Sequence, residues 1–108
     1  MGKNRVIESL SSLIGNTIVH KILIKETSKP ESANHLEFEE IEYRSQAIKK
    51  GMLFNWNNDD IKLLKEEITK KIEQKFKNKY SGIEMPKEKL QEMIDEEINQ
   101  VLRIKKSF

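Results

Sequence analysis

The clearest pattern in the chain lies between residues 57 and 80, where apolar side chains recur every three or four positions. Such spacing places them on one face of an α-helix, which has about 3.6 residues per turn. This stripe consists of Ile61, Leu64, Ile68, Ile72 and Phe76. Asn57 can cap the start of the helix, and Trp56 and Ile61 can pack together as a hydrophobic staple across that start. The pattern therefore predicts an amphipathic helix over residues 57–80.

Residues 86–106 repeat this pattern after a short connection. Its apolar positions are Leu90, Met93, Ile94, Ile98, Val101 and Leu102. Pro86 suits the first turn of a helix, because the N–H that it lacks has no partner there. Since a short connection makes consecutive helices run side by side in opposite directions, we expect the two segments to form an antiparallel pair.

Residues 29–50 predict a third helix, with a strand as the alternative. Ser28 and Pro30 suit its start and Gly51 its end. On a helical projection one arc holds Ala33, Leu36, Ile41, Tyr43, Ala47 and Ile48, with Phe38 outside it. Residues 36–43 also alternate apolar and acidic side chains, as a bulged β-strand would. The capping signals favour the helix.

The N-terminal segment, residues 3–25, is the most ambiguous part of the chain. A first helical stripe consists of Val6, Ile7, Leu10, Leu13 and Ile14. A second stripe on a rotated face consists of Ile18, Val19, Ile22 and Leu23. The rotation predicts a helix with a break near Gly15. The β-branched residues of 17–25 could instead form a strand that pairs with 36–43.

Two architectures follow from these patterns. The favoured one is an all-α, single-domain bundle of about four helices, spanning 3–25 with a break near Gly15, 29–50, 57–80 and 86–106. The alternative is an α+β fold, with a β-hairpin at 17–25/36–43 followed by a C-terminal αα-hairpin. A chain of 108 residues is long enough for one hydrophobic core, so we expect a single domain over 1–108.

Composition narrows the possible functions more than it identifies one. The chain has no cysteine, which excludes disulfides, thiolate metal sites and a cysteine nucleophile. Although 35% of residues are charged, the net charge is only +2, and this balance disfavours nucleic-acid binding. No apolar run is long enough to cross a bilayer or to form a signal core, so we expect a soluble cytoplasmic protein without membrane contact.

Catalytic and metal-binding motifs do not emerge from the sequence. His20 and His35 have no partner at metal-ligand spacing, and no serine lies in a nucleophile elbow. We therefore predict no catalytic residue, no metal ligand and no cofactor. An enzyme whose site is assembled from dispersed residues is the third-ranked function.

Two segments carry candidate contact residues. Phe54 and Trp56 lie in the most apolar loop, where they either close one end of the core or anchor a partner protein. The densest basic run holds Lys70, Lys71, Lys75, Lys77 and Lys79. These lysines could contact phosphates, but interspersed glutamates would repel the same backbone.

The leading functional hypothesis is a protein–protein interaction or self-association module. Long, narrow helices in a short chain often complete their core against another copy or another protein. Weak, non-specific nucleic-acid binding through the lysines is the alternative.

Overall fold

The chain folds into four α-helices in the computed structural model, which describes residues 3–26, 30–78 and 86–102, the side chains of 26 and 30–33 excepted. The helices are α1 (Lys3–Glu26), α2 (Pro30–Gly51), α3 (Asn58–Asn78) and α4 (Lys87–Leu102). No strand occurs in these ranges, so the predicted all-α bundle is confirmed and the β-hairpin alternative is not supported. Within the described ranges, no helix is long and apolar enough to span a membrane.

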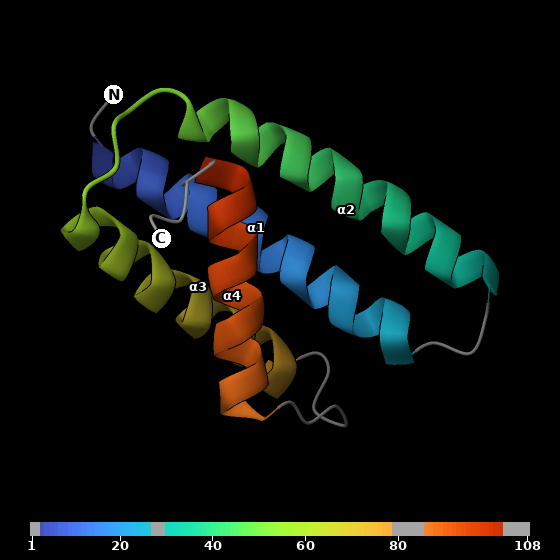
Figure 1. The fold of residues 1–108 in the computed structure, drawn as a ribbon. Coiled ribbons are helices and arrows are strands. Elements are labelled where there is room, and N and C mark those ends of the chain that lie inside the picture. Colours follow the sequence, from blue (N-terminus) through green and yellow to red (C-terminus); the bar gives the residue numbers. More distant parts are fainter. Residues whose placement is uncertain (1–2, 27–29, 79–85, 103–108) are drawn as a thin grey trace, which may run out of the picture.

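Helix α1 lies at the centre of the molecule, between α2 and α3 (Figure 1). Its buried apolar residues are Val6, Ile7, Leu10, Ile14, Ile18, Val19 and Ile22. The predicted break near Gly15 is wrong, because α1 is continuous from Lys3 to Glu26. A helix that packs against neighbours on several sides is apolar on more than one face. The rotation of the apolar stripe at Gly15 thus reflects a second packing partner.

Gly15 lies where α1 approaches α3, yet the space beside it can accept a methyl group. A Cβ atom at Gly15 would lie 3.8 Å from Lys71 Cβ and 3.9 Å from Ile72 Cγ1, which are ordinary contact distances. Alanine favours a helix over glycine by about 0.5–1 kcal/mol. We therefore expect Gly15→Ala to raise the free energy of unfolding by about that amount, measured by urea unfolding followed by circular dichroism.

Gly51→Ala is a suitable control for this prediction. A Cβ atom at Gly51 would lie 2.9 Å from Leu102 Cδ2, so that side chain would have to move. We expect no gain in stability there. A loss of stability in Gly15→Ala as well would show that the α1–α3 spacing does not tolerate a methyl group.

The packing of the helices differs from the predicted pairing of the last two. Helices α1 and α2 run side by side in opposite directions, and α3 packs on the other side of α1 through Leu64, Ile68 and Ile72 (Figure 1). Helix α4 crosses the bundle and contacts α1 and α2 as well as α3. The expectation that 57–80 and 86–106 pair along their length therefore needs correction, because the apolar stripe of α4 is shared among three helices.

The start of α3 confirms the predicted cap. The backbone N–H of Asp60 donates to Asn57 Oδ1 at 2.8 Å, and the backbone N–H of Asn57 donates to Asp60 Oδ2 at 3.2 Å. This reciprocal pair satisfies two donors that a helix start otherwise leaves without partners. Gly51 ends α2 as predicted. The predicted cap at Ser28 and the predicted helical residues 79–80 and 103–106 lie outside the described residues.

Helix α2 leaves two large apolar side chains in solvent. Phe38 is 75% exposed, in agreement with its place outside the predicted arc, and Ile41 is 60% exposed although the arc included it. Ala47 is fully buried, while Tyr43 and Ile48 are half-buried. The buried face of α2 is thus narrower than predicted. Helix α1 covers one side of α2, and α4 covers only part of the adjoining side.

Candidate functional site

A buried carboxylate on α4 is the centre of the most extensive polar network in the described part of the chain. The side chain of Glu97 is 0% exposed. Arg44 from α2 donates to both of its oxygens, with Nε 2.8 Å from Oε2 and Nη2 3.0 Å from Oε1. Lys21 from α1 donates to Oε1 at 2.8 Å. One carboxylate therefore ties three helices together.

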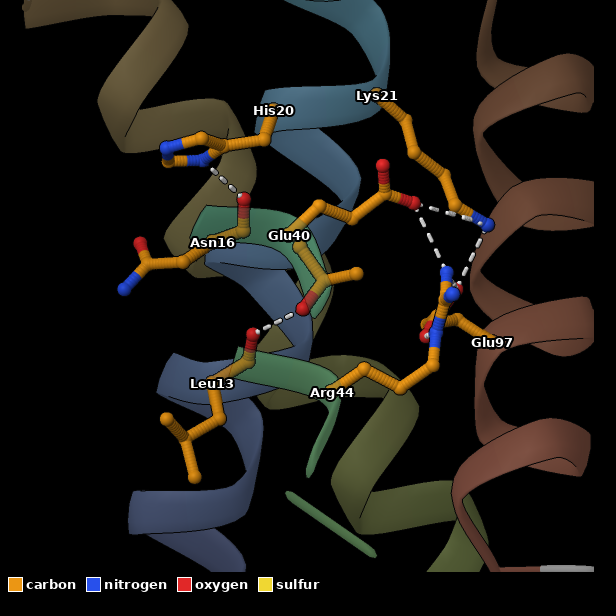
Figure 2. A network of polar contacts seen from close by, with 8 residues as sticks. Leu13, Asn16, His20, Lys21, Glu40, Arg44 and Glu97 are labelled. Carbon is orange, nitrogen blue, oxygen red and sulfur yellow. Dashed lines mark hydrogen bonds and ion pairs between the residues drawn. The ribbon is translucent and has the colours of Figure 1, made fainter. Parts of the chain in front are cut away.

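A second carboxylate completes the network. Arg44 Nη2 also donates to Glu40 Oε1 at 2.9 Å, and Lys21 Nζ lies 3.8 Å from the same oxygen. Figure 2 shows how the side chains of Lys21, Glu40, Arg44 and Glu97 converge. Two positive and two negative charges alternate, so the cluster has no net charge. Such alternation offsets the cost of removing these groups from water.

The network favours the ionised forms of Glu97 and Arg44. Burial alone would raise the pKa of Glu97, but the hydrogen bonds from Arg44 and Lys21 more than offset it, and the pKa lies below its usual range. The hydrogen bond to Glu97 also raises the pKa of Arg44 above its ordinary value. The charges on Glu97 and Arg44 are thus stable at neutral pH.

A cleft of about 520 Å³ opens beside the network, between α1, α2 and α4. Three apolar side chains line it, Ile24, Ile41 and Met93. The charged residues that line it are Lys21, Lys25, Glu37, Glu40, Arg44 and Glu96. Apolar surface with a balanced charged rim is typical of a binding surface. We call this surface the α1–α2–α4 cleft.

Glu39 on α2 contacts two histidines, His20 on α1 and His35 on α2 itself. His20 Nδ1 lies 2.7 Å from the carbonyl oxygen of Asn16, and Nε2 contacts Glu39 Oε2. His35 Nε2 lies 2.9 Å from Glu39 Oε1. The hydrogen bond from His20 lowers the pKa of Glu39.

These contacts pair every charged group of the network with an opposite charge. Arg44 donates to Glu97 and Glu40, and Lys21 donates to Glu97. Within the described ranges, no group of three or more His, Asp or Glu side chains could hold a metal ion. The network joins three helices beside a cleft.

The structure places Trp56 against the core and Phe54 beside Trp56. Trp56 packs against the buried cluster, and its Nε1–H donates to the carbonyl oxygen of Gly51 at 2.7 Å. Phe54 is half-buried and meets the Trp56 ring edge-on, with centroids 6.0 Å apart. Their neighbours Met52 and Leu53 are exposed. This geometry agrees with the core-closing role, and a role for the pair as a partner anchor stays a prediction.

The lysines of α3 do not form one surface. Lys70 and Lys77 are exposed, and Lys70 Nζ lies 3.8 Å from Glu67. Lys71 and Lys75 are half-buried and line a cleft between α1 and α3. Lys79 lies outside the described residues. The predicted phosphate contact of all these lysines stays a prediction, but only Lys71 and Lys75 share a concave surface.

Sequence reasoning missed the network, although α4 carries a signal for it. Glu97 lies inside the apolar stripe of α4, three residues after Ile94 and four before Val101. A charged residue at such a position must be buried with a partner. The partners themselves lack a comparable local signal, because Lys21 and Arg44 lie 76 and 53 residues away in the sequence.

Comparisons of this chain with models of known protein families, with curated proteins and with solved structures found no match.

Proposed function

We propose that this chain is an interaction module that self-associates through the exposed face of α2. The observation that carries the proposal is the pair of exposed apolar side chains, Phe38 and Ile41, beside the α1–α2–α4 cleft. Exposed apolar surface next to a cleft is a common mark of a protein interface. No contact with a membrane or a small molecule is needed to explain it.

A second copy suits this surface because α2 is complementary to itself. Phe38 and Ile41 lie near the middle of α2, which spans Pro30–Gly51. When two copies of α2 pack antiparallel about a two-fold axis, the middle of one meets the middle of the other. Phe38 of each copy can then enter the cleft of the other, where Ile24, Ile41 and Met93 form the apolar lining.

The charges along α2 support the antiparallel direction. The N-terminal half, residues 30–40, contains four glutamates and no lysine or arginine, and the C-terminal half ends in Lys49 and Lys50. Antiparallel pairing sets the acidic half of one copy against the basic half of the other, whereas parallel pairing sets like charges together. We therefore expect the association to weaken as salt increases.

The mass in solution tests the proposal. At tens of micromolar we expect the chain to sediment at twice its mass of 12.7 kDa. Burying a Phe side chain contributes about 1.5–3 kcal/mol, and a symmetric interface loses this contact twice. We expect Phe38→Glu to weaken the dimer by about 100-fold or more, measured by sedimentation equilibrium.

Leu53→Glu is the matched control, since it adds the same charge at an exposed apolar residue away from the cleft. It should leave the dimer intact. A wild-type chain that remains a monomer at these concentrations, or equal losses in the two variants, would refute self-association through α2.

A further inference from the structure

A cleft between α1 and α3 has a different chemistry from the α1–α2–α4 cleft. It has a volume of about 430 Å³, and the residues that line it are Ser12, Asn16, Lys71, Gln74, Lys75 and Asn78. None of these described lining residues is acidic. In the α1–α2–α4 cleft, by contrast, three acidic side chains balance three basic ones.

From this contrast we infer that the α1–α3 cleft binds a phosphate-type oxyanion, at a site separate from the proposed self-association surface. Lys71 and Lys75 lie one turn apart on α3, so both amino groups reach the same side of the helix. Phosphate oxygens accept hydrogen bonds from ammonium and amide groups, and the lysine, asparagine and glutamine side chains of the lining supply both kinds of donor. The two ammonium groups provide the positive charge.

Asn16 is oriented for this role by a contact already present. Lys75 Nζ donates to Asn16 Oδ1, a contact that uses the acceptor of the carboxamide. The donor side of the carboxamide, Nδ2, then remains as the group that Asn16 offers to a ligand. Figure 2 shows that its backbone carbonyl, on the other hand, faces His20, while its side chain points away from the Lys21–Glu97 network.

Tripolyphosphate is a suitable probe, because its charge and size exceed those of a single phosphate. In an NMR titration of the full chain at low salt, we expect saturable shifts of the side-chain amide signals of Asn16, Gln74 and Asn78. The midpoint should lie below about 1 mM. Absence of saturable shifts at these amides would overturn the inference.

Two double variants separate a defined site from general attraction to a basic helix. Lys71→Gln/Lys75→Gln and Lys70→Gln/Lys77→Gln each remove two positive charges from α3, but only the first pair lines the cleft. We expect the first to weaken tripolyphosphate binding at least about tenfold and the second less than about threefold. Equal losses of affinity in the two double variants would overturn the inference, because they would indicate a general attraction of the anion to the basic helix.

Asn16→Asp provides a test that does not depend on removing a lysine. The aspartate keeps an oxygen for Lys75 but places a negative charge where the ligand would bind, so binding should fall at least about tenfold. Binding equal to that of the wild-type chain would overturn the site. A short oligothymidylate added as competitor then distinguishes the sources of phosphate. Displacement of tripolyphosphate indicates a nucleic-acid backbone, and its failure indicates a small phosphorylated ligand.

Discussion

Replacing Glu97 with glutamine is expected to lower the free energy of unfolding by about 3 kcal/mol at neutral pH. Glutamine has nearly the same shape, but it removes the negative charge that Arg44 and Lys21 share. It also presents an amide donor where the carboxylate had accepted hydrogen bonds from both groups. Breaking a buried ion pair from one side costs more than the pair contributes, since the remaining charges lose their partner.

Urea unfolding followed by circular dichroism measures this loss. Glu96→Gln is the matched control, because it makes the same chemical change at the neighbouring, exposed residue. Surface substitutions of this kind change stability by less than about 0.5 kcal/mol. Equal and small effects of the two variants would mean that the Glu97 network contributes nothing to stability.

The stability difference between the wild-type chain and Glu97→Gln is expected to depend on pH. The folded-state pKa of Glu97 lies below its ordinary value of 4.5, so the unfolded chain takes up this proton first as the pH falls. The stabilisation by Glu97 is therefore fully present above about pH 4.5 and is lost progressively below it. We expect the stability difference between the wild-type chain and Glu97→Gln to be largest at neutral pH and to shrink in acid. A constant difference between pH 7 and about pH 3 would indicate a steric effect instead.

Truncation of Leu64 to alanine is expected to destabilise the fold by about 2–5 kcal/mol. Leu64 is 0% exposed and lies in the cluster through which α3 packs against α1, together with Ile68 and Ile72. Removing three side-chain carbons there takes away buried apolar surface and leaves a cavity that the surrounding helices fill only in part.

The neighbouring Leu63 makes an unusually close control. The two residues undergo the same change on the same helix, but Leu63 is 39% exposed. Leu63→Ala should cost less than about 1 kcal/mol, since part of its apolar surface already faces water. Thermal and urea unfolding of both variants measure the difference. Similar losses would contradict the burial assigned to α3.

The candidate site contains features that could not be predicted from the sequence. Glu97 interrupts the apolar stripe of α4, but it was not identified as a candidate from the sequence, and neither of its partners could be assigned from spacing. Ile41 was expected in the core and is 60% exposed. Helical periodicity indicates the apolar arc of α2, but it does not indicate which side of that arc α1 covers. The exposed pair on α2 and the α1–α3 cleft likewise exist only once the helices are packed.

The sequence by itself determined the local structure of this protein. Helical periodicity, the Asn57 cap and the Gly51 stop depend on interactions within a few residues, so four helices could be predicted with nearly correct bounds. The tertiary structure decided that α1 is continuous and central, that α4 crosses three helices, and that Lys21, Arg44 and Glu97 meet. These features depend on contacts between segments that are distant in the sequence. An apolar stripe indicates which face of a helix is buried, but it does not indicate which other helix covers that face.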